Sequence, residues 1–286
     1  MNVSTSVVIP ARNAAETIGY QLDALAQEPL ELATIIVADN GSTDETAAVV
    51  GRFADRLPLE IVDASARAGS AAARNIGVAA TTSDVLLFLD ADDLMLPGWF
   101  SALRAAAVEG PVGGPVLFAS RSEARRGAAA FAERRRPTAL PVHDGVVPFQ
   151  QSCNFGLPRT VFDAVGGFDE RFRVTHDIDL SIRLADAGYP VRFVEEACVV
   201  TTRRPDLRGA ARQFYEYGRD EALLRREHPE AFRDLRAKQR LRRWIRIPAT
   251  LPRLRTPEGR YGWVTNAACC GGRIVGAAQL RRGSIG

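Results

Sequence analysis

The first ninety residues alternate short, fully apolar segments with segments of helical periodicity. Strands that are apolar on both faces, and separated by helices of about a dozen residues, are typical of a parallel sheet covered on both sides. We therefore predict an α/β fold with a mostly parallel central sheet flanked by helices. The strands are predicted at 6–10, 35–38, 59–62 and 85–89, and the helices between them at 15–27, 44–56 and 70–80.

Beyond Asp93 the alternation becomes less regular. The pattern predicts a helix at 97–108, a strand at 115–119, and a helix followed by a loop within 120–141. A second patterned block spans residues 153–200, and a basic helical extension is predicted over 206–286. The 286 residues suffice for one large α/β domain and a small appendage.

The charge of the chain is small but unevenly distributed. The net charge of +3 does not indicate a nucleic-acid partner, whereas residues 231–286 carry thirteen Lys and Arg against two acidic residues, a net +11. An imperfect apolar stripe runs among these arginines. A basic amphipathic helix with this pattern suits an anionic membrane surface, and it would equally pack on the catalytic domain with its charges solvated. The stripe consists of Phe232, Leu235, Leu241, Trp244 and Ile245.

The remaining composition constrains the compartment. The four cysteines show no CxxC spacing and no accompanying histidine cluster, so neither a disulfide framework nor a zinc site is indicated. Neither a signal core nor an apolar segment of roughly 18 residues is found. We therefore expect a cytoplasmic protein, and any membrane contact would be peripheral, at the inner face of the plasma membrane.

Polar residues follow the predicted strands at the edge where open parallel sheets bind ligands. Pro10, Ala11 and Arg12 follow the first strand, and Asp39 follows the second. In the segment after Asp39, Asn-Gly is a turn, and Ser42 with Glu45 is predicted to form a capping box. That structural interpretation leaves Asp39 unexplained, and its carboxylate is suited to accept the imide hydrogen of a nucleobase.

The sharpest signal is the acidic cluster after the strand at 85–89. Asp90, Asp92 and Asp93 follow a buried strand, where three carboxylates repel one another unless a cation binds. Asp90 and Asp92 alternate and can face one pocket, in which oxygen ligands would hold Mg²⁺ or Mn²⁺ against a diphosphate. Capping of the next helix is the alternative, and it accounts for one of the acids, Asp93.

A glycine opens the helix predicted at 70–80. Gly69 leaves the first backbone amides of this helix available to a phosphate. Arg74 could reach the same charge, and a solvated position on the helix face is the competing interpretation.

The second block carries a further set of candidate residues. Asp177 stands at the start of a predicted helix, where it is either an N-cap or a general base that takes a proton from an acceptor hydroxyl. Asp179 and Arg183 are spaced for a structural i, i+4 ion pair.

Taken together, these motifs resemble the family-2 glycosyltransferases of the GT-A fold. The resemblance covers about residues 5–200 and rests on an ordered set of motifs rather than on any one of them. The matching elements are 7–13, Asp39 with 40–46, 73–75, 90–93, 166–170 and 177–180. The resemblance implies a catalytic domain at 1–205, with a nucleotide-sugar half at 1–93 and an acceptor half at 94–205.

The family resemblance also implies a reaction and a role for each motif residue. It implies metal-assisted, inverting, single-displacement transfer of a sugar from a nucleotide-sugar, with UDP favoured, to a hydroxyl acceptor that is either a saccharide or lipid-linked. The implied base is Asp177, the metal site is Asp92 with Asp90, and the donor site is Pro10, Ala11, Arg12, Asp39, Gly69, Arg74, Asp90 and Ala91. Asn154, His176, Arg203 and Arg204 are expected to contact the acceptor or the diphosphate.

Two departures from the family pattern support a rival interpretation. His176 stands where the family usually has Glu, and 201–204 lack the histidine that many members place after the preceding strand. The imidazole could tune the base or bind the acceptor, and Arg203 or Arg204 could supply positive charge to the departing diphosphate, or lie in a loop that contacts only solvent. The rival is a catalytically degenerate scaffold or binding protein at the membrane. A sugar nucleotidyltransferase is disfavoured, because residues 10–13 are not a glycine-rich phosphate loop.

Overall fold

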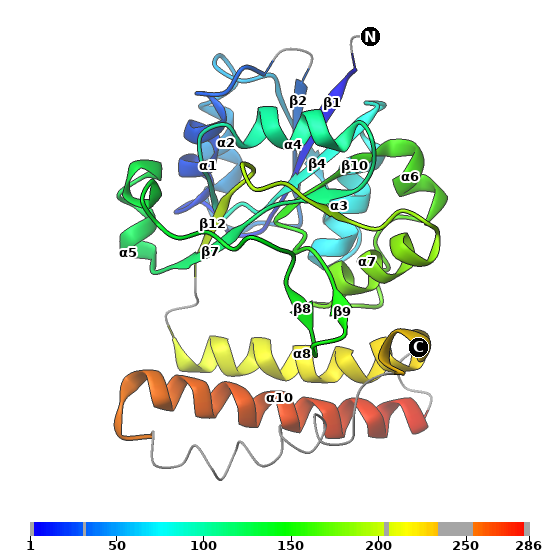
Figure 1. Cartoon of the computed structure of the whole chain (residues 1–286). Coiled ribbons are helices and arrows are strands. Elements are labelled where there is room, and N and C mark those ends of the chain that lie inside the picture. The colour runs from blue at the N-terminus through cyan, green and yellow to red at the C-terminus, as the bar shows by residue number, and fades with distance from the viewer. Residues whose placement is uncertain (1–2, 31–32, 203–205, 234–253, 283–286) are drawn as a thin grey trace.

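The computed structural model describes residues 3–30, 33–202, 206–233 and 254–282, which form an α/β domain lying over a pair of long helices (Figure 1). The central sheet of this region has seven strands, and β10 alone runs antiparallel to its neighbours. In spatial order they are β11 (Arg192–Phe193), β6 (Val112–Gly113), β10 (Asn154–Pro158), β4 (Val85–Leu89), β1 (Thr5–Ala11), β2 (Ala33–Asp39) and β3 (Leu59–Asp63).

Alternate residues of the central strands pack into two separate cores, one on each face of the sheet. Val7 and Ile9 of β1 pack with the helices of one face, whereas Val8 packs with those of the other. Strands β1 and β4 are thus buried on both sides, as the sequence predicted, whereas the edge strand β3 is largely exposed. The first face carries α1 (Ile18–Leu25), α2 (Thr46–Gly51) and α4 (Trp99–Ala107), and the second carries α3 (Ser70–Ala79), α6 (Arg159–Ala164) and α7 (His176–Asp186).

The strand predictions hold better than the helix predictions. β4 begins and ends where the sequence placed it, while α1 begins only at Ile18, because Ala14 closes a turn by accepting from the amides of Thr17 and Ile18. Only two short helices, α5 (Arg121–Ala124) and the 3₁₀ helix η1 (Ala128–Phe131), form where a longer one was predicted within 120–141.

Two small sheets complete the domain. One has the order β5 (Leu94–Met95), β12 (Val199–Thr202) and β7 (Val116–Ala119), and it brings Thr202 to the acidic cluster, where its hydroxyl donates to the carbonyl oxygen of Asp92 at 3.5 Å. The other is a hairpin of β8 (Val142–His143) and β9 (Val147–Pro148), which projects toward the long helices (Figure 1).

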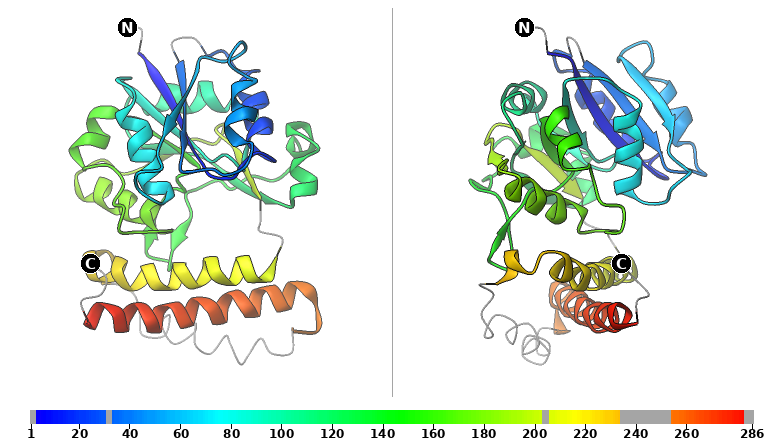
Figure 2. Two further views of the ribbon diagram at one scale, coloured as in Figure 1. Left: turned by 180° about the vertical axis from the view of Figure 1, so that it is seen from behind. Right: turned by 90° about the vertical axis from the view of Figure 1, so that its right-hand side faces the viewer.

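The predicted helical extension is present as two helices that lie side by side beneath the domain (Figure 1; Figure 2). They are α8 (Leu207–Glu227) and α10 (Pro257–Arg281), with the 3₁₀ helix η2 (Glu230–Phe232) after α8. Most of the predicted basic stripe, including Trp244, lies outside the described residues. No helix within the described ranges is long and apolar enough to cross a membrane.

Glycines bring the backbones of α8 and α10 into direct contact. A Cβ atom built on Gly272 would lie 2.0 Å from the carbonyl oxygen of Tyr215, and one on Gly218 would lie 2.0 Å from that of Cys269. At Gly271, the residue before Gly272 on α10, such a Cβ would lie within 4 Å of no atom beyond its chain neighbours and the nearby backbone of its own helix. The two helices therefore depend on particular glycines rather than on a general richness in small residues.

We expect Gly272→Ala to lower the free energy of unfolding by about 1–3 kcal/mol, because the methyl group overpacks a backbone contact. Gly271→Ala is the matched control, and it should leave stability unchanged or raise it by up to about 1 kcal/mol, since alanine is the better helix former. Thermal or denaturant unfolding of both variants measures the difference. Equal stabilities would contradict the glycine-dependent contact.

Candidate active site

A cleft of about 530 Å³ opens at the carboxyl ends of the parallel strands β1 and β4. Its volume lies in the range of small-molecule sites, and its position is the one that open α/β sheets use for ligands. Among the described residues it is lined by Pro10, Ala11, Arg12, Asn13, Ala14, Glu16, Thr17, Asn40, Gly69, Ser70, Ala73, Asp90, Ala91, Asp92, Arg121 and Thr202.

The wall after β1 is held by the loop after β2. The amide of Asn13 donates to the hydroxyl of Ser42 at 3.0 Å, and the side chain of Asn13 accepts from the amide of Thr43 at 2.8 Å. Asn13 has a φ of 51°, a conformation that asparagine tolerates better than most residues. These bonds fix the backbone of Pro10, Ala11 and Arg12 along the cleft.

The loop after β2 differs from its prediction in one respect. The Ser42–Glu45 capping box is wrong: α2 begins at Thr46 without a side-chain cap, and Ser42 instead uses its hydroxyl for Asn13. The Oδ1 atom of Asp39 accepts from the amide of Ser42 at 2.8 Å, which orients the carboxylate. Asp39 is half-buried beside the cleft and not among the residues that line it, so its contact with a nucleobase stays a prediction.

The backbone amides at the start of α3 face the cleft. Gly69 precedes the helix at a φ of 119°, and its own amide donates to Asn40 at 2.9 Å. In the part of the chain that the structure describes, no side chain caps this helix, and Ser70 and Ala73 line the cleft. A helix start in this state is suited to bind a phosphate.

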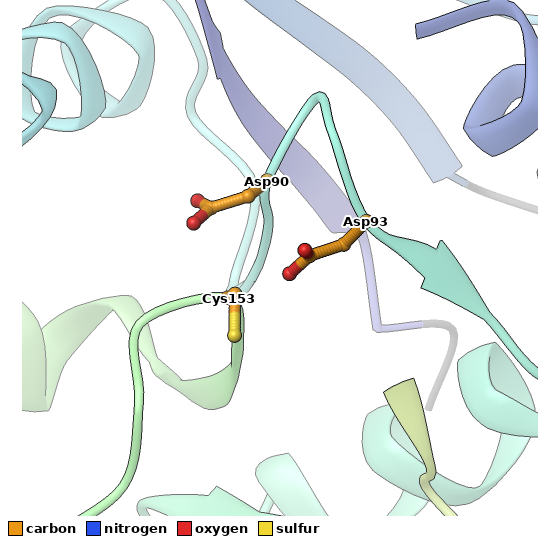
Figure 3. A group of neighbouring side chains, drawn as sticks. All are labelled: Asp90, Asp93 and Cys153. Carbon is orange, nitrogen blue, oxygen red and sulfur yellow. The ribbon is translucent and has the colours of Figure 1, made fainter. Parts of the chain in front are cut away.

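The acidic cluster after β4 divides between the cleft and the interior. Asp90 and Asp92 both line the cleft, and Asp92 is exposed. Asp93 is 3% exposed and turns inward, and the carboxylate of Asp90 extends to the same side of the turn, near Cys153 (Figure 3). Ligand atoms of Asp90, Asp93 and Cys153 all lie within 4.8 Å of one another. The alternative interpretation, in which Asp93 caps the next helix, is wrong, because α4 begins at Trp99 with Gly98 before it.

Burial favours the neutral forms of the inward members of the cluster. Burial, together with the charges of Asp92 and Asp90, raises the pKa of Asp93 well above its usual range, and burial likewise raises the pKa of the Cys153 thiol. Asp92 and Asp90 bring carboxylate oxygens to the cleft wall, and these hard oxygen ligands fit a divalent cation such as Mg²⁺ or Mn²⁺.

Arg74 lies beneath the cleft and not on a solvated helix face. Its side chain is 1% exposed and forms an ion pair with Asp90. Its Nη1 atom donates to Nε2 of His176 at 3.1 Å, and the guanidinium lies 5.6 Å from the ring centroid of Phe168. Arg74 is absent from the cleft lining, so it acts on a ligand through Asp90.

His176 is an interior partner of Arg74. It is 5% exposed, and its Nε2 atom also lies 3.2 Å from the hydroxyl of Ser152. Burial and the charge of Arg74 lower the pKa of His176 to about 3, so the ring is neutral and accepts with Nε2. Its expected contact with an acceptor is not supported by this position.

Asp177 has the proton affinity of a general base. It is the second residue of α7, and its Oδ1 atom accepts from the amide of Ile178 at 2.9 Å. Burial raises the pKa of Asp177 to about 7, and the bond from Ile178 and the charge of Arg74 oppose that rise. A carboxylate with a pKa near neutrality is suited to proton abstraction.

Asn154 is a correction to the expected set. It is fully buried on β10, where its Oδ1 atom accepts from the indole of Trp99 at 2.8 Å. Its Nδ2 atom donates to the carbonyl oxygens of Pro115 and Ala197 at 3.1 and 2.8 Å. With these bonds made, Asn154 ties strands together and is not available to an acceptor. Arg203 and Arg204 lie outside the described residues.

The model of the family described as glycosyl transferase family 2 matches residues 6–166. This stretch contains β1, β4 and the whole acidic cluster. The chain belongs to glycosyl transferase family 2.

Named relatives of this family-2 chain are glycosyltransferases. The pre-mycofactocin glycosyltransferase of Mycobacterium tuberculosis is 31% identical over 242 residues, which cover 79% of this chain and 48% of the relative. The glycosyltransferase AglE of Haloferax volcanii is 28% identical over 70% of this chain and 67% of its own length. The chain thus spans about half the length of the mycobacterial relative.

Solved structures confirm the GT-A fold. A mannosyltransferase from Pyrobaculum calidifontis, in complex with GDP-mannose and Mn²⁺, has a TM-score of 0.63 at 19% identity and covers 96% of this chain and 87% of its own. The protein TarS of S. aureus, in complex with UDP-GlcNAc, has a TM-score of 0.55 at 16% identity, with 98% and 92% covered.

Some cleft residues of this family-2 chain were missed from the sequence. Arg121 follows β7 at the start of α5 and reaches the cleft because β7 pairs with β12. Thr202 was noted only as a departure from the family pattern. Thr202 lies in the small sheet and Arg121 follows its strand β7, and the pairing of these distant short strands has no local sequence signal. Ser120 and Glu123 do form a capping box beside Arg121.

Proposed function

We propose that this chain is an inverting glycosyltransferase that moves a sugar from a nucleoside-diphosphate sugar, with UDP favoured, to a hydroxyl acceptor. One observation carries the proposal: a single buried residue, Arg74, pairs with Asp90 in the cleft wall and acts electrostatically on Asp177. A phosphate-binding helix start, an acidic cleft and a base with a raised pKa are thereby joined in one site.

The diphosphate of the donor is assigned to the cleft between α3 and the acidic cluster. The start of α3 at Gly69 and Ser70 supplies amides, and Arg12 and Arg121 supply positive charge at the cleft wall. The carboxylate of Asp39, which the amide of Ser42 orients, would accept a hydrogen bond from the base. The sugar then extends toward Asp177.

Asp92, with Asp90, would hold the divalent cation. When bound there, Mg²⁺ or Mn²⁺ would neutralise charge on the leaving nucleoside diphosphate. Arg74 holds the Asp90 carboxylate in place, since removal of that partner would leave a half-buried carboxylate unpaired.

Asp177 would take the proton of the acceptor hydroxyl as its oxygen attacks the anomeric carbon. The bond from that carbon to the diphosphate oxygen breaks in the same step, so the configuration inverts and the electron pair leaves with the diphosphate. A base with a pKa of about 7 is about half ionised at neutral pH and accepts the proton readily.

Calorimetry of UDP, GDP and dTDP, with and without Mn²⁺, tests the donor site. We expect one nucleotide to bind in a metal-dependent manner, and Asp92→Ala to weaken that binding by about tenfold or more, because a tenfold change needs only about 1.4 kcal/mol of lost interaction. Asp55→Ala is the matched control, an exposed aspartate in the turn after α2. Failure of all three nucleotides to bind would favour the degenerate scaffold instead.

A further inference from the structure

Helix α8 lies beyond the residues matched by the family, yet it contacts the segment that leads into α7. Figure 1 shows α8 passing below the domain from the end of β12 to the region under α7. Leu223 and Leu224 of α8 pack in one apolar cluster with Ile178 and Ile182 of α7. The helix that carries the proposed base is therefore packed on the C-terminal extension.

The backbone just before α7 is bonded by a side chain of α8. Thr175 occupies the N-cap position, but within the described chain its side chain makes no capping bond. Instead, the amide of Val174 donates to Oδ2 of Asp220 on α8 at 2.8 Å. Asp220 is 3% exposed, and burial raises its pKa, while backbone hydrogen bonds from Val174, Arg173 and Thr175 and the charge of Arg219 oppose that rise. The buried carboxylate of Asp220 thus bonds to the backbone that leads into the start of α7 and Asp177.

The position of Asp220 is fixed from the opposite side of α8. The neighbouring Glu221 accepts from Nε of Arg273 on α10 at 2.6 Å and from Arg225, which also pairs with Asp144 in the β8–β9 hairpin. Two residues before Asp220, Gly218 meets the α10 backbone. These contacts hold α8 against α10 and the β8–β9 hairpin, and they thereby fix the position of Asp220 next to α7.

The same face of α8 also reaches the surroundings of Asp177. Tyr217 lies one turn before Asp220, and its hydroxyl is hydrogen-bonded to the side chain of Gln213. Burial and the nearby charge of Asp177 raise the pKa of Tyr217, so it stays a neutral phenol. Among the described residues, the charged groups that act on Asp177 include Arg74 and Asp90, and the neutral phenol of Tyr217 lies near it.

We propose that α8 is a positioning element of the active site, in which the Asp220 carboxylate holds the backbone before α7 and thereby sets the place of Asp177. The proposal rests on the role of Asp177 given above. It assigns the extension a part in catalysis that is separate from any attachment to a membrane.

A purely structural contact makes a different prediction. Glu227 at the end of α8 pairs with Arg171 at 3.1 Å, and His228 bonds to Oδ1 of Asp179 at 2.7 Å, so α8 also holds this region at points away from the start of α7. If Asp220 only adds one more contact between α8 and the domain, replacing it should affect activity in the same way as replacing Glu227. If it positions the base, its loss should change the chemistry of Asp177.

The test compares Asp220→Ala, Asp220→Asn and the control Glu227→Gln in the full chain, with hydrolysis of UDP-glucose, or of the nucleotide-sugar selected by calorimetry, as the reaction. We expect Asp220→Ala to lower kcat by about 10- to 100-fold with KM for the donor within about twofold, because a shift of the base by about 1 Å costs that much. The pH at which kcat falls to half its maximum on the acidic side should move below pH 7. An Asp177 that is no longer held in place is better solvated, and its pKa is then lower.

Asp220→Asn keeps an acceptor oxygen but removes the charge, so we expect its kcat and the acidic limb of its pH profile to lie near those of the wild type, as should those of Glu227→Gln. An equal shift in Asp220→Asn and Asp220→Ala would overturn the proposal in favour of a charge effect. Wild-type behaviour of Asp220→Ala would overturn it as well.

Hydrogen exchange gives a readout independent of activity. In Asp220→Ala the amides of 173–178 should exchange faster, while those of β1 and β4 keep their protection. If the wild type hydrolyses no nucleotide-sugar, the proposed function fails, but exchange still decides whether Asp220 holds the start of α7. If the amides of 173–178 exchange at the wild-type rate in Asp220→Ala, the positioning role is wrong.

Discussion

Asp177→Asn is expected to lower kcat for sugar transfer by about 10²–10⁴-fold and to leave nucleotide binding intact, because it removes the general base but keeps the size and hydrogen-bonding capacity of the side chain. Asp186→Asn is the matched control, since Asp186 is exposed at the far end of the same helix. Steady-state kinetics and calorimetry on both variants measure the two effects. Asp177→Asn turnover within threefold of the wild type would assign the base elsewhere.

The pH dependence of the wild type follows from the same residue. The base acts when ionised, and its pKa is raised to about 7, so activity should rise with pH and reach half its maximum near pH 7. Because the folded pKa exceeds the unfolded value, ionisation of Asp177 opposes folding as pH rises from about 4 to 7. Asp177→Asn should therefore be no less stable than the wild type at pH 8, and lost activity cannot then be attributed to unfolding.

The sequence predicted those parts of the site that depend on local pattern. Pro10 and Asp90 were assigned to one edge because parallel strands bring their carboxyl ends together, and both line the cleft. Val7, Val8 and Ile9 predicted a strand buried on two faces, and the two cores confirm it. Such features can be predicted from the hydrophobic periodicity of the sequence and from the direction of the strands.

Features that depend on distant pairs were not predictable in this way. Arg74 and His176 are 102 positions apart in the chain, so neither residue alone indicates a buried contact. Asn154 was expected in the acceptor site because it is polar, but its bonds to Trp99, Pro115 and Ala197 form only when three elements meet. Likewise, α10 packs through Gly272 and not through an apolar stripe, and therefore lacks the usual signal of a packed helix.

Arg74→Met is expected to have the largest effect on stability, because it leaves Asp90 without its cation and removes a donor from His176. Breaking a buried ion pair costs about 3–5 kcal/mol. The side chain of Asp90 is 33% exposed, so water should offset part of the loss, and we expect about 2–3 kcal/mol. Arg74→Lys should recover little, since one ammonium cannot reproduce the planar fork that contacts both Asp90 and His176.

A double-mutant cycle with Asp90→Asn separates charge from packing. If the penalty in Arg74→Met comes from the uncompensated carboxylate, Asp90→Asn in that background should restore stability while nucleotide binding stays weak. If the penalty comes from the lost contact of the guanidinium with Phe168, the double variant should be as unstable as Arg74→Met. Denaturant unfolding of the four proteins decides between these causes. Recovery of stability without recovery of binding would show that Arg74 is retained in the interior to hold the Asp90 carboxylate at the cleft, which a neutral pair of the same size cannot do.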